Sequence, residues 1–166
     1  WPDLPTPVRM MRPDAAPILV SARQTGREYE LDVREGTLFI RTNDTHRNFR
    51  IATTQLDRPG DWQDLIAGSD GCYIRGLTAF KRHLAISERI DGLDQIRLRT
   101  YHGDEHRIAF PEASYTASLA ATPEYDPAAY RLSYQSMVTP PTVYDYDPDA
   151  HSLKTLKVQI IPSGYD

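Results

Sequence analysis

The sequence predicts an all-β protein, a partial β-propeller of about three and a half four-stranded antiparallel blades. A block of short strands recurs along the chain, beginning at Tyr29, Tyr73 and Tyr115, which stand 44 and 42 residues apart. This spacing is typical of a propeller blade. No window sustains the 3.6-residue period of an amphipathic helix, so the sequence indicates strands and turns throughout.

The opening segment, 1–25, is expected to hold the last strands of a preceding blade. Its prolines exclude a regular helix, because each one removes a backbone donor and crowds the preceding turn. Two short extended pieces remain between them, at 8–11 and 18–22. The prolines are Pro2, Pro5, Pro7, Pro13 and Pro17.

The first full blade is expected over 28–67. Tyr29, Leu31 and Val33 alternate with acidic residues, which is the two-residue period of a half-buried strand. Turn dipeptides and polar connections then separate three more strands. These are expected at 37–42, 49–56 and 62–66.

Two further blades are expected over 72–111 and 115–162. Asp91-Gly92 is a strong hairpin signal in the first of them, because both residues tolerate the positive φ of a tight turn. Strands are expected at 73–80, 83–90, 94–101, 105–110, 115–120, 130–136, 142–146 and 153–161.

A β-sandwich and an open barrel are the alternative folds, since both also contain short strands at intervals of about 8 to 12 residues. Neither has a reason to repeat a four-strand block, so the propeller is favoured. A closed propeller has about four to eight blades. We therefore predict one incomplete propeller domain over 1–166, with a catalytic domain absent.

Composition excludes several classes of partner. A formal charge of −4 offers no basic field for nucleic acid. No apolar run reaches the roughly 18 residues of a membrane-spanning helix, and the opening residues lack the features of a signal peptide. The single cysteine, Cys72, excludes an internal disulfide and favours a reducing, cytoplasmic setting; we interpret it as a packed residue rather than a reactive thiol.

Possible metal ligands form no convincing set. His102 and His106 have the spacing of paired ligands on a helix, but here they span a hairpin turn with no third ligand nearby. Asp145, Asp147 and Asp149 lack the glycine and the distant glutamate of a calcium loop. We assign no metal site, and we expect the remaining loop histidines, His46 and His151, at the surface.

Catalytic motifs are also missing. No Gly-x-Ser-x-Gly turn is present, and Ser69 and Ser163 lie in turn-like segments. Nothing brings a carboxylate pair such as Glu124 and Asp126, or Glu28 and Glu30, to catalytic separation. No glycine-rich loop precedes a helix, so no cofactor is expected. The chain alone is therefore predicted to have no catalytic residue.

Three stretches, 48–62, 87–98 and 134–147, resemble the oligopeptidase B branch of the prolyl oligopeptidase family of serine peptidases. The most specific is Tyr-Gln-Ser-Met-Val-Thr-Pro-Pro-Thr-Val-Tyr-Asp-Tyr-Asp. The resemblance implies a seven-bladed propeller that caps an α/β-hydrolase domain holding the Ser, Asp and His of the triad. This chain would be the second half of that propeller, and no catalytic residue is carried over to it.

The resemblance also implies a parent enzyme that cleaves short peptides after Arg or Lys, with the propeller restricting access. Partners would be the missing blades and the hydrolase domain, or further copies of this chain joined through open blade edges. An independent β-rich interaction module, unrelated to peptidases, is the alternative. A small metal-dependent enzyme using His102 and His106 is a third hypothesis.

Overall fold

A computed structural model describes residues 7–8 and 18–160. Within these ranges the regular structure consists of strands alone. The N-terminal strands and the first four-stranded sheet are β1 (Pro7–Val8), β2 (Ile18–Leu19), β3 (Tyr29–Arg34), β4 (Thr37–Thr42), β5 (Arg50–Gln55) and β6 (Gln63–Ile66). The remaining strands are β7 (Cys72–Ala79), β8 (His83–Ile90), β9 (Leu93–Thr100), β10 (Glu105–Arg107), β11 (Tyr115–Leu119), β12 (Tyr130–Ser136), β13 (Thr142–Asp147) and β14 (Ser152–Val158).

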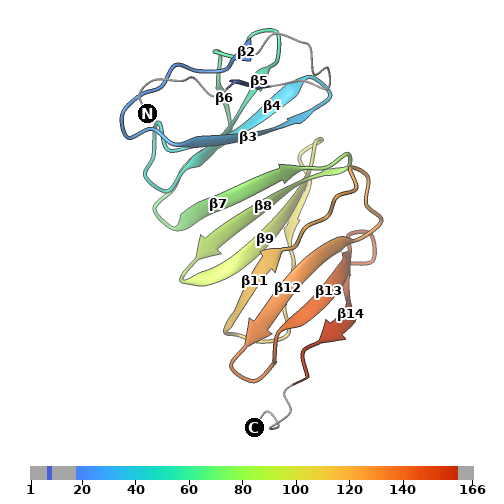
Figure 1. Cartoon of the computed structure of the whole chain (residues 1–166). Coiled ribbons are helices and arrows are strands. Elements are labelled where there is room, and N and C mark those ends of the chain that lie inside the picture. Colours follow the sequence, from blue (N-terminus) through green and yellow to red (C-terminus); the bar gives the residue numbers. More distant parts are fainter. Residues whose placement is uncertain (1–6, 9–17, 161–166) are drawn as a thin grey trace. The chain divides into compact units, whose positions relative to one another are not determined.

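The strands from β3 onward form three four-stranded antiparallel sheets, and in each the neighbours in space are neighbours in the chain (Figure 1). The sheets are β3-β4-β5-β6, β7-β8-β9-β10 and β11-β12-β13-β14, with β1 and β2 paired separately. This sequential order within four-strand units is that of propeller blades. It confirms the predicted fold class.

The chain divides into two compact units, residues 1–69 and 70–166. In the first unit, Leu38 and Ile40 of β4 are fully buried and Val20 nearly so. Tyr29 and Trp62 pack beside them, with their rings edge to face at a centroid distance of 5.6 Å. The strand is confirmed, and Tyr29 and Leu31 pack against this core as the alternation predicts, but Val33 of the same predicted face is 38% exposed.

An ion pair ties the polar connection after β4 to the sheet in the same unit. The Arg50 guanidinium donates from Nε and Nη2 to the two carboxylate oxygens of Asp44, at 2.8 and 2.7 Å. It also contacts Asp64 of β6. Such a two-pronged contact is geometrically specific, so the loop between β4 and β5 is held in one position.

In the second unit, the β7–β10 and β11–β14 sheets pack face to face through one apolar cluster. Strand β9 lies against β11. Leu98 and Leu132 are fully buried there, and the rings of Phe110 and Tyr134 stack at 5.2 Å. The buried members of the cluster are Phe80, Ala85, Ile96, Leu98, Ile108, Ala117, Tyr130, Leu132, Tyr134 and Tyr146.

The hairpin turns follow the sequence signals closely. Asp91 and Gly92 have φ angles of 50° and 82°, and Glu35 and Gly36 have 48° and 80°. Two consecutive residues with positive φ match the twist of the flanking strands, which is why such dipeptides favour two-residue hairpins.

Three strands end three residues earlier than predicted: β2 at Leu19, β14 at Val158, and β10. The cause is clearest at β10. This strand ends at Arg107 rather than at Phe110. Phe110 precedes a proline, which restricts its backbone, and its ring packs against Tyr115 and Tyr134 instead of continuing the ladder. Of the expected strand at 8–11, only Val8 lies in the described residues; the expected tail 162–166, with Ser163, lies outside them.

Replacing Gly68 with alanine should destabilise the first unit. A Cβ at this position would overlap the His46 side chain and lie 2.9 Å from the Phe49 carbonyl oxygen. Overpacking of this kind costs about 1–3 kcal/mol. Chemical denaturation followed by tryptophan fluorescence measures the change in the free energy of unfolding.

Gly60→Ala is the matched control in the same unit, since nothing lies within 4 Å of its added Cβ. It should change the free energy of unfolding by less than about 0.5 kcal/mol. Equal effects of the two substitutions would contradict the packing described around Gly68.

Candidate functional site

The second unit contains a cleft of about 900 Å³. Side chains of Arg75, Arg89 and Asp94 line it, together with residues from all four strands of the β11–β14 sheet. Gln95, the residue after Asp94 in β9, donates from its amide to the Tyr115 hydroxyl at 3.1 Å, so this end of β9 lies beside the start of β11. The remaining lining residues are Thr116, Ala117, Ser118, Ser133, Tyr134, Gln135, Pro141, Thr142, Val143, Lys157, Val158, Gln159 and Ile160.

Asp94 fixes two guanidinium groups at this end of the cleft. Its Oδ1 accepts hydrogen bonds from Arg75 Nη1 at 2.7 Å and from Arg89 Nη2 at 3.1 Å. The Asp94 side chain is only 7% exposed, whereas those of Arg75 and Arg89 are 46% and 48% exposed. A buried carboxylate therefore orients two cationic groups that face solvent.

Local strand geometry explains why these three residues meet. Arg89 and Asp94 face each other across the hairpin that joins β8 to β9. Arg75 is the extra residue of a β-bulge between Ile74 and Gly76, where the pairing of β7 with β8 shifts register. A bulge redirects the side chain of its extra residue, and here Arg75 contacts the same carboxylate.

A row of side chains crosses the β11–β14 sheet next to this charged end. Ser118 pairs with Ser133, Ser133 with Val143, and Val143 with Lys157. Ser118, Ser133 and Lys157 are exposed, while their neighbours Ala117, Leu132 and Tyr134 belong to the core cluster. This row is therefore on the sheet face opposite the core, and its small hydroxyl groups leave room for the cleft.

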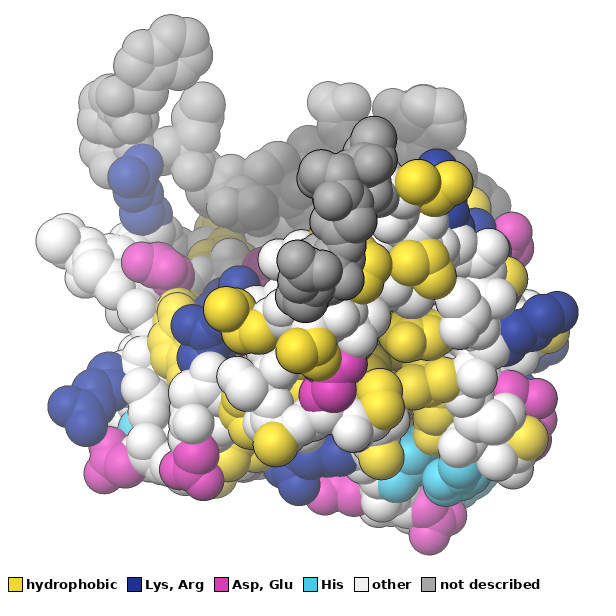
Figure 2. Space-filling model, turned by 90° about the horizontal axis from the view of Figure 1, so that it is seen from below, with side chains coloured by type: hydrophobic (Ala, Val, Ile, Leu, Met, Phe, Trp, Pro, Cys, Tyr) yellow, Lys and Arg dark blue, Asp and Glu magenta, His cyan; other side chains and the backbone are white. Residues whose placement is uncertain are grey.

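A second polar group lies where the two sheets of the unit meet. His83 Nδ1 is 2.8 Å from the Tyr130 hydroxyl, and His106 Nε2 is 2.9 Å from the Tyr146 hydroxyl. His151 stacks on His106 at a centroid distance of 4.2 Å. Figure 2 shows histidine side chains grouped at the surface next to acidic ones. These contacts, which we call the histidine seam, join β8 and β10 to the β11–β14 sheet.

Burial lowers the pKa of both seam histidines that bond tyrosine. The pKa of His83 is lowered by burial and then by the nearby charge of Arg82. The pKa of His106 is lowered by burial and then by His151. Burial also raises the pKa of Tyr130 to about 12. Neutral rings and neutral phenols are therefore the forms that this seam favours at neutral pH.

The histidines considered as metal ligands do not converge. His106 uses its Nε2 on Tyr146, and His102 is exposed in the turn. In the part of the chain that the structure describes, no three His, Cys, Asp or Glu side chains gather in a way that could hold a metal ion. His151 is exposed, as expected. Its stacking on His106 could not be predicted, because the two residues are 45 positions apart in the sequence.

The aspartates considered as a calcium loop have separate partners. Asp145 pairs with Arg131 at 3.1 Å, and Asp149 pairs with Arg82. Asp147 Oδ1 accepts from the backbone N–H groups of Asp149 and Ala150, at 2.8 and 2.9 Å. The run thus closes a turn and forms surface ion pairs.

The other residues weighed as catalytic also lie apart. Asp126 pairs with Lys81 at 2.7 Å, and Glu30 lies 3.8 Å from Arg41. The Ser69 carbonyl accepts from the Asn48 side chain at 2.9 Å. These contacts stabilise turns and surfaces, and none places a nucleophile beside a base.

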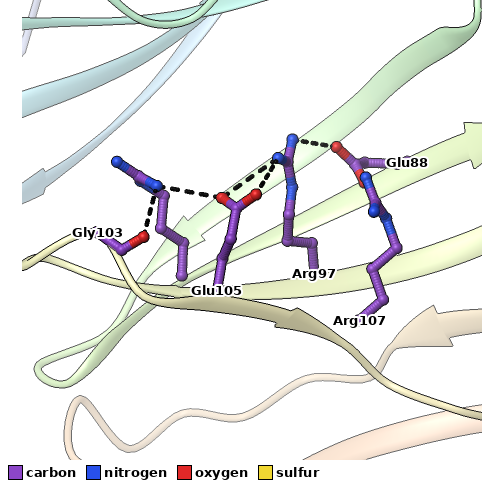
Figure 3. Close-up of polar contacts among 6 residues, drawn as sticks. Glu88, Arg97, Gly103, Glu105 and Arg107 are labelled. Carbon is purple, nitrogen blue, oxygen red and sulfur yellow. Dashed lines mark hydrogen bonds and ion pairs between the residues drawn. The ribbon is translucent and has the colours of Figure 1, made fainter.

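A buried ionic network lies on the β7–β10 sheet (Figure 3). Glu88 is fully buried and accepts hydrogen bonds from Arg97 and, at 3.1 Å, from Arg107 Nε. Arg97 also contacts Glu105 at 3.2 Å, and Arg99 joins Glu105 to the Gly103 carbonyl. The charges alternate along the chain of contacts, so each is balanced by its neighbours.

Cys72 lies close to this network and is half-buried. Burial, with a further contribution from Glu88, raises the pKa of its thiol to about 11. The protonated thiol is a poor nucleophile. The structure thus supports the interpretation of Cys72 as a packed residue.

The three sequential four-stranded sheets define a segment of a β-propeller. Residues 7–159 match the family model of the prolyl oligopeptidase N-terminal beta-propeller domain. The chain therefore belongs to the prolyl oligopeptidase family, as a part of that propeller domain. This membership is incompatible with the alternative of a module unrelated to peptidases.

Individual relatives agree with this placement. Dipeptidyl aminopeptidase BI of Pseudoxanthomonas mexicana is 32% identical over 151 residues, which cover 89% of this chain and 21% of the relative. Protease 2 of Moraxella lacunata is 26% identical over 148 residues, with the same shares covered. The structure of oligopeptidase B from Trypanosoma brucei superposes with a TM-score of 0.84 at 26% identity, covering 91% of this chain and 23% of that one.

These matches confirm the resemblance to the oligopeptidase B branch. The chain spans about a fifth of the length of the curated relatives. The described residues contain no helix that is long and apolar enough to cross a membrane.

Glu88→Gln should destabilise the second unit by about 3 kcal/mol, because it takes from the buried Arg97 its buried anionic partner and leaves it only the more exposed Glu105. Arg107→Gln should cost less than about 1 kcal/mol, because Arg107 is 44% exposed and water replaces its contact. Urea denaturation of both variants measures the difference. Equal losses of unfolding free energy in the two variants would contradict the difference in burial between Arg97 and Arg107.

Lowering the pH should destabilise the histidine seam. Since the pKa values of His83 and His106 are lowered in the folded state, the unfolded state binds more protons as the pH falls below about 6.5. The free energy of unfolding is thus unchanged above about pH 6.5 and falls as the pH is lowered below it. The fall ends once the pH is below the pKa values of the folded state. The melting temperature, followed from about pH 7.5 to about pH 5, checks this.

His106→Gln should reduce this pH dependence, because the amide keeps a hydrogen bond to Tyr146 but does not titrate. His102→Gln is the control, since His102 is exposed in a turn. If the two variants lose the same fraction of the pH dependence, the seam is not its source.

Proposed function

We propose that this chain is part of the substrate-gating propeller of a serine peptidase of the oligopeptidase B type, and that the parent enzyme cleaves short peptides after Arg or Lys. The match of residues 7–159 to the N-terminal propeller domain carries the proposal. The preference for basic residues follows from the resemblance to oligopeptidase B.

The solved relative supports the gating part of the proposal. Oligopeptidase B of Trypanosoma brucei is described in a closed form with covalently bound antipain. A propeller that keeps larger substrates from the active site requires the enzyme to have such a closed form. Leu38 and Leu132 are fully buried, and close packing of this kind resists deformation.

Partners follow from the length of the relatives. We propose that this chain works with the remaining blades and with a hydrolase domain that supplies the catalytic Ser, Asp and His. By itself it would associate with further copies through open blade edges such as β14, where Leu156 and Val158 are exposed. A cytoplasmic location, suggested by the single cysteine, is part of the same proposal.

The chain alone should not hydrolyse an arginyl chromogenic substrate, whereas the longer protein encoded with it should. Turnover should respond to a serine-directed inhibitor and favour Arg or Lys over Pro before the cleaved bond. The measurement is the initial rate on matched arginyl, lysyl and prolyl p-nitroanilides.

A folded protein containing the same arginyl bonds is the control for gating and should resist cleavage by the longer protein. A preference for prolyl substrates would overturn the proposed specificity. Inhibitor-sensitive turnover by the chain alone would overturn the assignment of catalysis to another domain.

A further inference from the structure

The turn between β12 and β13 presents apolar side chains outside the core cluster. We infer that this turn, residues 136–141, is a docking tip, on which Met137 and Val138 seat the propeller against the hydrolase domain of the parent enzyme. The identity of the partner domain rests on the proposed function, whereas the interaction surface itself rests on exposure and geometry.

Exposure marks the docking tip as an interaction surface. Met137 is 85% exposed and Val138 is 68% exposed, and Ile160, just after β14, is 87% exposed. These are the three most exposed large hydrophobic side chains in the part of the chain that the structure describes. Exposed apolar side chains are ordinary where they are scattered, but a group of them indicates a binding surface.

The three side chains share one end of the β11–β14 sheet. Strands β12 and β14 run in the same direction in this antiparallel sheet, so the turn after β12 and the end of β14 lie at the same end (Figure 1). The Gln159 N–H donates to the Pro141 carbonyl oxygen at 2.8 Å. This bond holds the residue before Ile160 against the turn.

Charge distinguishes the two ends of this sheet. The docking tip contains no charged residue. The connections at the opposite end, from β11 to β12 and from β13 to β14, contain four acidic residues, Glu124, Asp126, Asp147 and Asp149. Depletion of charge is typical of the centre of a protein interface. The uncharged end is therefore the one suited to a protein partner.

A neighbouring blade would leave the docking tip uncovered. Blades pack against one another through the faces of their sheets, so the ends of their strands project on the two sides of the ring. Strand β12 ends at Ser136, and Met137 and Val138 follow it. Their partner therefore comes from outside the ring of blades.

Hydrogen bonds hold the docking tip in one conformation. Ser136 Oγ accepts from the backbone N–H groups of Val138 and Thr139, at 3.0 and 2.8 Å. The Thr139 hydroxyl donates to Glu112, in the connection between β10 and β11. Two consecutive prolines then restrict the backbone. A turn fixed in this way loses little conformational entropy on binding, which favours association.

The position of the docking tip in the chain indicates its partner. The match to the propeller domain, which is N-terminal in its family, runs to residue 159, and the N–H of that residue bonds the tip. In the proposed parent, the chain therefore leaves the propeller beside the tip and continues into the hydrolase domain. A domain joined at this point is held near the tip at a high effective concentration.

Oxidation of Met137 by hydrogen peroxide tests the contact, because a covered methionine is oxidised more slowly than an exposed one. In the 166-residue chain, Met137 should react within about twofold of the rate of the peptide acetyl-Ser-Met-Val-amide. In the longer protein it should react at least about tenfold more slowly. Mass spectrometry of tryptic peptides measures these rates. Equal rates in the chain and in the longer protein would overturn the inference.

A photochemical cross-link identifies the partner. p-Benzoylphenylalanine in place of Val138 should cross-link the longer protein to its own residues C-terminal to Asp166. The same group in place of Ala150, which is exposed in the turn between β13 and β14, is the control and should form no such cross-link. Cross-linked dimers through position 138 would identify a second copy as the partner and refute the inference. Cross-links from position 138 to the propeller alone would also refute it.

Val138→Asp should weaken the contact, because it buries an unpaired charge there. In the longer protein it should speed the oxidation of Met137 at least about threefold, whereas Ala150→Asp should not. Neither substitution should shift the melting temperature of the chain alone, since both positions are exposed. A shift would show that the turn stabilises the sheet itself and would count against a docking role.

The inference and the proposed function can fail separately. A parent that cleaves after Arg or Lys but leaves Met137 unprotected would refute this inference alone. Protection of Met137 in a parent that does not cleave there would support the docking tip and refute only the proposed specificity.

Discussion

The packing of the β7–β10 sheet against one face of the β11–β14 sheet determines the rest of the second unit. Leu98 and Leu132 are fully buried in that contact. Each buried side chain of this size contributes about 1.5–3 kcal/mol relative to exposure. Because one face of the β11–β14 sheet is committed to this contact, the other face is left for polar side chains. The floor of the cleft and the tyrosines of the histidine seam are both consequences.

The fold could be predicted from the sequence because its signals are local. Alternation of apolar and polar residues at Tyr29, Leu31 and Val33 predicts a strand whatever the rest of the fold is. Asp91-Gly92 marks a hairpin because positive φ is a property of the residues themselves. Strand β10, one of three that end earlier than predicted, shows the limit of such signals, since Phe110 leaves the ladder to join a cluster made by residues distant in sequence.

The candidate site could not be predicted in the same way. Arg89 and Asp94 flank a recognisable hairpin, so their pairing was within reach of sequence reasoning. Arg75 was not, because the bulge that aims it depends on a register shift that has no residue signature. The full burial of Glu88 and the contact between His106 and Tyr146 likewise depend on sheet packing across 9 to 40 residues of sequence.

Buried and exposed residues alternate strictly along β12, and this alternation restricts how the length of the strand can change. Tyr130, Leu132 and Tyr134 are buried, whereas Arg131, Ser133 and Gln135 are exposed. Inserting a single residue in the strand would exchange the two sets beyond the insertion, burying a guanidinium and exposing tyrosine rings. Related sequences should therefore differ in length outside the strand, and within it only by pairs of residues.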